Sequence, residues 1–288
     1  MNPWLLASRP KTLSAAIVPV LMGSALAADE PAAITWWVLV CALLGAVLIQ
    51  IATNFINDAL DFKKGADTGE RLGPLRVTAA GLITVEGVMR GAWICLIGAA
   101  LCGIPLLYRC GWPMLLIGLA SIAAAYAYTG GPYPLAYHGL GELFVIAFFG
   151  LVAVGGTFYA HSLQWTPSAV LAGFAAGSLA TVLLVINNLR DVDSDRRSDK
   201  RTLAVRFGQG FARGEIMFFA LTPFIAVAFL GWMREQYGFL LTLGALPVAV
   251  MLIVRTFRSS GADLNRSLAL AGGLQWAFGA LFVAGAMI

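Results

Sequence analysis

The chain has 288 residues, of which 59% are hydrophobic and only 12% are charged, and its mean hydropathy is +0.82. A soluble domain cannot bury that much apolar surface, so the composition excludes a soluble protein and predicts a polytopic helical membrane protein. The formal net charge is +4. Basic residues that face anionic lipid headgroups account for this charge, so we expect the lipid bilayer as a partner and no nucleic acid.

Nine apolar runs of about spanning length follow one another along the chain, at residues 12–28, 34–57, 88–108, 113–130, 139–160, 167–188, 214–232, 238–254 and 267–287. If the N-terminus is cytoplasmic, all but two of the 19 Lys and Arg residues fall on the cytoplasmic side, the exceptions being Arg109 and Arg234. This distribution is the positive-inside pattern. We therefore predict an all-α bundle of nine transmembrane helices with a cytoplasmic N-terminus, forming a single domain over residues 1–288.

The first run also resembles a secretory signal peptide, because basic residues precede an apolar stretch that ends in Ala25-Leu26-Ala27. We expect the first span to be retained. The later topology is the same in either case.

The end of the second run carries an acidic cluster, Asn54-x-x-Asn57-Asp58-x-x-Asp61, with Asp67 further along. At 100° per residue, the cluster and Gln50 lie within a sector about 100° wide on an otherwise apolar helix. Polar groups facing lipid are costly, so this stripe should face the interior of the bundle.

The end of the sixth run carries a second cluster, Asn187-Asn188-Leu189-Arg190-Asp191-x-Asp193-x-Asp195. Asn187, Asp191 and Asp195 are each four residues apart and share one face if the helix persists, whereas Asp193 points away. The topology places both clusters on the cytoplasmic side, so they could converge.

Carboxylates on two facing helices are typical ligands of Mg²⁺, which often bridges one or two of them to substrate phosphates. Solvated helix ends would explain Asp67 and Asp193 as well, but they explain Asn54, Asn57 and Asp58 poorly. We therefore predict that Asp58, Asp61, Asp191 and Asp195 bind the metal. Nearby Lys and Arg side chains are expected to neutralise the remaining phosphate oxygens.

The chain resembles the intramembrane prenyltransferases of the UbiA superfamily in two motifs, Asn57-Asp58-Ala59-Leu60-Asp61 and Asp191-Val192-Asp193-Ser194-Asp195. The resemblance covers essentially the whole chain. The chain is most similar to the 1,4-dihydroxy-2-naphthoate polyprenyltransferases of menaquinone synthesis. Further motifs carry that likeness: Arg9-Pro10-Lys11-Thr12, Gly73-Pro74-Leu75-Arg76, Asn187-Asn188-Leu189-Arg190-Asp191, Tyr128-Thr129-Gly130, Pro132-Tyr133 and Gly139-Leu140-Gly141-Glu142.

The resemblance implies an Mg²⁺-dependent enzyme that transfers a polyprenyl group from a polyprenyl diphosphate to 1,4-dihydroxy-2-naphthoate, releasing diphosphate and CO₂. It implies a multi-pass protein of the cell inner (plasma) membrane with its active site toward the cytoplasm. The expected catalytic residues are Asn57, Asp58, Asp61, Asp191 and Asp195. The expected substrate-binding residues are Arg9, Asn54, Lys63, Arg76, Tyr128, Asn187, Asn188, Arg190 and Lys200.

Two alternatives remain open at this point. A UbiA-type enzyme could use another aromatic acceptor, such as 4-hydroxybenzoate or homogentisate, because the acidic clusters would serve any acceptor. An ion-coupled transporter is the other class, since intramembrane carboxylates also mark ion paths. Both clusters lie on one side, however, and the outer halves of the spans lack charged residues. Glu142 could lie near the acceptor or could cap the start of its helix, where a carboxylate is favoured. Asp67 and Asp193 have no assigned role, and the prenyl length and oligomeric state are not encoded in these motifs.

Overall fold

The computed structural model describes residues 2–28, 34–65 and 72–288. These residues form helices and no strand, which confirms the all-α prediction. Seven helical segments among them are long and apolar enough to cross a membrane. They are α3 (Trp36–Lys63), α4 (Val85–Cys110), the run α6–η3–α7 (Gly141–Ser162), α8 (Pro167–Arg190), α10 (Leu203–Arg234), the run η4–α11 (Tyr237–Arg258) and the run η5–α12 (Gly261–Gly285).

Two shorter apolar helices, α2 (Ser14–Leu26) and α5 (Trp112–Ala127), coincide with the other two predicted spans. They have 13 and 16 residues, fewer than the roughly 20 that a straight span needs. The structure thus supports a multi-pass membrane protein, while the count of nine spans and the cytoplasmic N-terminus stay predictions.

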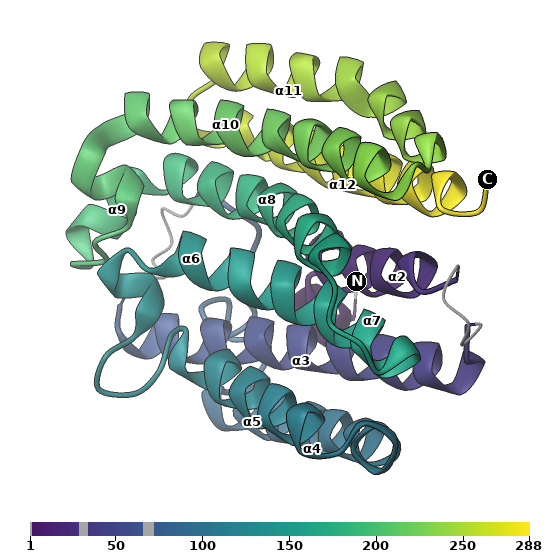
Figure 1. Ribbon diagram of the computed structural model, residues 1–288. Coiled ribbons are helices and arrows are strands. Elements are labelled where there is room, and N and C mark those ends of the chain that lie inside the picture. Colours follow the sequence, from purple (N-terminus) through teal and green to yellow (C-terminus); the bar gives the residue numbers. More distant parts are fainter. Residues whose placement is uncertain (1, 29–33, 66–71) are drawn as a thin grey trace.

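The long helices lie side by side in one bundle (Figure 1). The pair α3 and α4 packs together on one side with α5, and α10, α11 and α12 form the other side. Between them lie α8 and the α6–η3–α7 run, and α2 contacts α3, α7, α8 and α12. Because α2 is largely buried, the helix that resembles a signal peptide forms part of the core.

Glycines hold the α6–η3–α7 run directly against α8. A Cβ atom on Gly150 would lie 2.3 Å from the carbonyl oxygen of Gly173, and one on Gly177 would lie 2.8 Å from that of Ile146. Small residues allow such backbone contact between membrane helices. Residues Ile146–Val152 of this run form a π-helix. The contact fixes the register between the start of α6 and the end of α8.

Short helices precede or connect the long ones at the end of the bundle that carries the acidic clusters. They are α1 (Pro3–Ser8), η1 (Pro10–Thr12), η2 (Leu135–His138) and α9 (Val192–Arg197). Helix α10 begins at Leu203, well before the predicted residue 214, and bends at Gly208, whose φ is 86°. Hydropathy does not detect this first part of α10 because Arg206, Gln209 and Arg213 interrupt its apolar residues.

Candidate active site

The first acidic cluster faces the interior of the bundle, as its helical spacing predicted. Gln50, Asn54, Asp58 and Asp61 on α3 are all buried. The Nδ2 atom of Asn54 donates to the carbonyl oxygen of Ser8 at 2.9 Å and to the hydroxyl of Thr12 at 3.3 Å. Asn54 therefore ties the N-terminal segment that contains Arg9 to α3.

Asp58 holds part of the connection between α3 and α4 against α3. Its carboxylate accepts hydrogen bonds from the backbone N–H groups of Val77 at 3.2 Å and Thr78 at 3.1 Å, and from the Thr78 hydroxyl. The segment folds back against α3 and brings Arg76 to Asp61, with Nη2 3.3 Å from Oδ2. Both side chains are buried, so this ion pair is shielded from water.

The second cluster continues the helical hydrogen-bond ladder past the end of α8. The N–H of Asp191 donates to the Asn187 carbonyl at 3.0 Å, and that of Asp195 donates to the Asp191 carbonyl at 2.8 Å. These three residues therefore lie one turn apart. Arg190 binds both carboxylate oxygens of Asp191, at 2.8 and 2.7 Å.

One carboxylate oxygen of Asp195 has no hydrogen-bond partner. Its Oδ1 lies 3.4 Å from the Lys200 ammonium, whereas its Oδ2 is buried without a hydrogen-bond partner. Burial raises the pKa of Asp195 to about 6, with Lys200 opposing the shift and the charges of Asp191 and Asp61 adding to it. The two acidic clusters are therefore close enough to interact.

Tyr137 stands between the two clusters. Its hydroxyl donates to Oδ1 of Asp61 at 2.9 Å, and its carbonyl accepts from the N–H of Arg201 at 3.0 Å. The Lys64 and Lys200 ammonium groups lie 4.2 and 5.9 Å from its ring centroid. Burial, together with the charge and hydrogen bond of Asp61, raises the pKa of the Tyr137 phenol. The phenol therefore stays protonated.

Four further hydrogen bonds link segments around the site. The Thr129 hydroxyl donates to Oδ1 of Asn57, and Lys64 donates to the Thr129 carbonyl at 2.6 Å. At the start of α12, Asn265 accepts from Arg190 Nη1 at 2.9 Å and donates to the Leu72 carbonyl at 2.8 Å. Asn265 therefore joins the second acidic cluster to the segment that follows the first one.

The carboxylates suit a hard cation. Among the described residues, no group of three or more His, Cys, Asp and Glu side chains lies ready to hold a metal, because Asp61, Asp191 and Asp195 each pair with a basic side chain. The donor atoms are nevertheless carboxylate oxygens, which Mg²⁺ prefers, and the unpartnered Oδ2 of Asp195 is one of them. Asp58 differs from the other three because both of its oxygens hold the backbone at residues 77–78.

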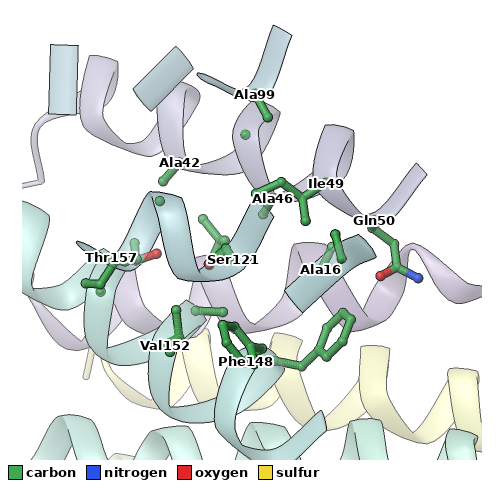
Figure 2. Close-up of a pocket in the computed structure, with 18 of the residues that line it drawn as sticks. Ala16, Ala42, Ala46, Ile49, Gln50, Ala99, Ser121, Phe148, Val152 and Thr157 are labelled. Carbon is green, nitrogen blue, oxygen red and sulfur yellow. The ribbon is translucent and has the colours of Figure 1, made fainter. Parts of the chain in front are cut away.

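An apolar cavity of about 210 Å³ opens beside these clusters, between α2, α3, α4, α5 and the α6–η3–α7 run. Figure 2 shows Ala46, Ile49, Ser121 and Phe148 around this space, with Gln50 at one edge. Along α3 its lining runs from Cys41 to Thr53, about 18 Å at 1.5 Å per residue. Tyr128 and Thr53 mark the end nearest the acidic clusters.

The predicted site residues fall into two groups. The structure places Asp61, Asp191 and Asp195 in ion pairs with Arg76, Arg190 and Lys200, respectively, while Tyr137 lies between Asp61 and Lys200 and Tyr128 lines the cavity. Of the other residues, Asn187 donates to the Leu183 carbonyl of its own helix at 2.9 Å, Asn188 donates to Glu142 at 3.1 Å, and Lys63 and Asp193 are exposed. Asp67 lies outside the described residues.

Sequence reasoning missed Tyr137, Thr78 and Asn265, and it gave Thr129 no role although Thr129 belongs to the Tyr128-Thr129-Gly130 motif. Tyr137, Thr78 and Asn265 belong to no charged cluster and to no predicted apolar run, so no pattern in the sequence distinguishes them.

Three comparisons with known proteins bear on this site. Residues 16–286 match the UbiA prenyltransferase family. A 1,4-dihydroxy-2-naphthoate octaprenyltransferase of Mycobacterium tuberculosis is 37% identical over 96% of this chain and 98% of its own length. The enzyme of the same name from Escherichia coli is 40% identical over 73% of this chain and 70% of its own.

Among solved structures, a UbiA homologue from Archaeoglobus fulgidus bound to DMAPP and Mg²⁺ has a TM-score of 0.67, with full coverage of both chains and 17% identity. At that identity the likeness concerns the fold alone. It agrees with the helical bundle described above.

Proposed function

This chain belongs to the UbiA prenyltransferase family, and we propose that it transfers a polyprenyl group from a polyprenyl diphosphate to 1,4-dihydroxy-2-naphthoate, releasing diphosphate and CO₂ and giving demethylmenaquinol. One observation supports this proposal above the others. Carboxylates on α3 and on the α8–α9 segment pair with basic side chains, and Tyr137 bonds to Asp61 near one end of an apolar cavity. The acceptor follows from the similarity to 1,4-dihydroxy-2-naphthoate octaprenyltransferases.

The diphosphate of the donor binds at the acidic clusters. Arg76, Arg190 and Lys200 now pair with carboxylates, and they are placed to neutralise phosphate oxygens there. Arg9, held beside α3 by the contacts of Asn54, and Lys63 stay in the proposed substrate-binding set with Asn54, Tyr128, Asn187 and Asn188. Asn57 keeps its proposed place in the catalytic set.

Asp61, Asp191 and Asp195 are the carboxylates that would hold Mg²⁺, and Asp58 would share its oxygens between the metal and the backbone at residues 77–78. When bound, the metal supplies electrostatic stabilisation to the departing diphosphate. The protein itself orients the donor, and its apolar cavity takes the prenyl chain and keeps water from the allylic cation. The ring carbon of the acceptor then attacks C1 of the prenyl chain.

The proposal includes the sidedness of the protein. We propose that residues 1–288 form one transmembrane domain of nine spans in the inner membrane, with the acidic clusters on the cytoplasmic side. The charge distribution along the sequence supports this orientation.

The test is a competition assay on the purified full-length protein in detergent, with labelled octaprenyl diphosphate, Mg²⁺ and equal concentrations of 1,4-dihydroxy-2-naphthoate and 4-hydroxybenzoate. We expect prenylated naphthoate and equimolar CO₂. A larger kcat/KM for 4-hydroxybenzoate would replace the acceptor but keep the reaction class. No transfer to either acceptor would overturn the proposal.

Asp193→Asn is the matched control for Asp195→Asn. Both carboxylates belong to the same motif, but Asp193 is exposed and Asp195 is buried beside Lys200. The proposal expects activity close to that of the parent protein for Asp193→Asn and a loss of about 100-fold or more for Asp195→Asn.

A further inference from the structure

Glu142 is a buried carboxylate, and one of its two oxygens has no hydrogen-bond partner. It begins α6, and its side chain is 6% exposed. Asn188 Nδ2 donates to Oε1 at 3.1 Å, which orients the carboxylate, whereas Oε2 is buried and has no hydrogen-bond partner. A buried acceptor without a donor is unfavourable. The arrangement is suited to a ligand that brings a proton donor.

Tyr128 shows where that ligand would lie. Its ring lines the apolar cavity, and its hydroxyl packs against the start of α6, since a Cβ atom on Gly141 would lie 3.3 Å from it. The charges of Glu142, Asp61 and Asp195 all act on the Tyr128 phenol. Glu142 is therefore near the junction of the apolar cavity and the acidic clusters, where an aromatic acceptor would meet C1 of the donor.

We propose that Oε2 of Glu142 accepts the proton of the acceptor hydroxyl that is adjacent to the reacting ring carbon, and later returns it. This inference rests on the proposed function, in that it requires a hydroxyl-bearing aromatic acceptor. Glu142 is then a catalytic residue, and Asn188 is the residue that positions it.

The proton that Glu142 takes returns to the acceptor oxygen by the end of the reaction. As the bond between C1 of the prenyl chain and the diphosphate oxygen breaks, the ring carbon bearing the carboxylate bonds to C1. The hydroxyl proton moves to Glu142, and its electron pair forms a ring ketone. The product of this step is a β-keto carboxylate, which loses CO₂. The electron pair of the broken carbon–carbon bond restores the aromatic ring, and the oxygen takes its proton back from Glu142.

Other charged groups lie around Glu142. Lys200, on the segment after α9, interacts with its charge. Glu215 on α10 is also close enough for charge interaction, and its Oε2 is likewise buried without a partner. Glu215 is therefore the matched control, because it is a second carboxylate of the same neighbourhood, half-buried and with no bond to Asn188.

The experiment uses the full-length protein, its Glu142→Gln variant and its Glu215→Gln variant. Gln keeps the shape of Glu142 and the bond from Asn188, but its amide cannot take a proton. We expect Glu142→Gln to lower kcat about 100-fold or more, the scale of general acid–base catalysis, with the donor KM unchanged. Glu215→Gln should keep kcat near the parent value.

A second measurement separates proton transfer from loss of structure. Inhibition constants are compared for acceptor analogues that carry either the hydroxyl or a methoxy group at that position. The parent protein should bind the hydroxyl analogue about tenfold more tightly, because a hydrogen bond to a charged group is lost in the methoxy analogue. Glu142→Gln should lose this preference.

Several outcomes would overturn the proposal. They are a parent protein that does not distinguish the two analogues, a Glu142→Gln variant that retains full kcat, and a loss of the preference in Glu215→Gln instead. If the parent protein uses 4-hydroxybenzoate in place of the naphthoate, the proposed acceptor changes, but the same analogue test applies to the hydroxyl of that acceptor. A wrong acceptor in the proposed function and a wrong role for Glu142 therefore give different results.

Discussion

The substitution Asp58→Asn distinguishes a structural role from metal binding. Asp58 accepts two backbone hydrogen bonds, from Val77 and Thr78, and a third from the Thr78 hydroxyl. Asn has nearly the same shape but carries no charge and only one acceptor oxygen. We expect the variant to release the segment that holds Arg76 against Asp61, and so to weaken the site even before a metal binds.

The magnitude follows from these hydrogen bonds. A bond to a charged group contributes about 1.5–3 kcal/mol and a neutral one about 0.5–1.5 kcal/mol, so the bond that Asn retains loses about 1 kcal/mol. The other backbone N–H then faces the NH₂ group of Asn without an acceptor, which costs about 1–3 kcal/mol. Val77 and Thr78 are 0% and 5% exposed, so water cannot replace the lost acceptor. The total is about 2–4 kcal/mol.

Amide hydrogen exchange at Val77 and Thr78 measures this quantity directly, in the absence of Mg²⁺ and substrate. Asp58→Asn should lower the free energy of opening at both amides by about 2–4 kcal/mol, whereas Asp193→Asn should leave it unchanged. If the two amides keep their protection in Asp58→Asn while activity is lost, the anchoring role is wrong and Asp58 acts through ligation alone.

Three further predictions concern other parts of the molecule. Asp195→Asn should abolish the rise in melting temperature that Mg²⁺ and diphosphate together cause, without lowering the melting temperature of the free protein, because it removes a buried carboxylate oxygen that has no partner. An unchanged Mg²⁺ effect would exclude Asp195 as a ligand. Gly177→Ala should destabilise the protein strongly, since its Cβ would lie 2.8 Å from the Ile146 carbonyl oxygen, whereas Gly214→Ala, which has open space, should not. Gly118→Leu should lower kcat/KM for long donors more than for short ones, because Gly118 lines the cavity and its Cβ would meet nothing within 4 Å. Equal effects on both donor lengths would contradict a role of this cavity in holding the chain.

The sequence predicts the parts of this structure that depend on periodicity. Seven of the predicted spans appear as long apolar helices, and the polar stripe on α3 is buried as its helical spacing requires. The i and i+4 relation of Asn187, Asp191 and Asp195 is also found, because the backbone ladder continues past α8. Each of these depends on residues within a few turns of one another.

The missed features depend on contacts between distant segments. Tyr137 reaches Asp61 from the connection between α5 and α6, and the Thr78 backbone returns to Asp58 after a long connection. Neither connection has a period that fixes its path. Asn188, a predicted substrate-binding residue, also orients Glu142 from the neighbouring helix through its amide, and no pattern in the sequence indicates that contact. A pattern shows which residues are polar, but not which partner satisfies them.

The contacts of Asn265 have a consequence for the order in which the protein matures. Asn265 lies at the start of α12 and joins Arg190, within the second cluster, to Leu72, which follows the first cluster. Since a chain is synthesised from its N-terminus, both acidic clusters emerge from the ribosome well before Asn265 does. A nascent chain therefore contains every proposed metal ligand while it still lacks the residue that links their two segments. Completion of the last helix is then the step that turns an inserted bundle into a closed site.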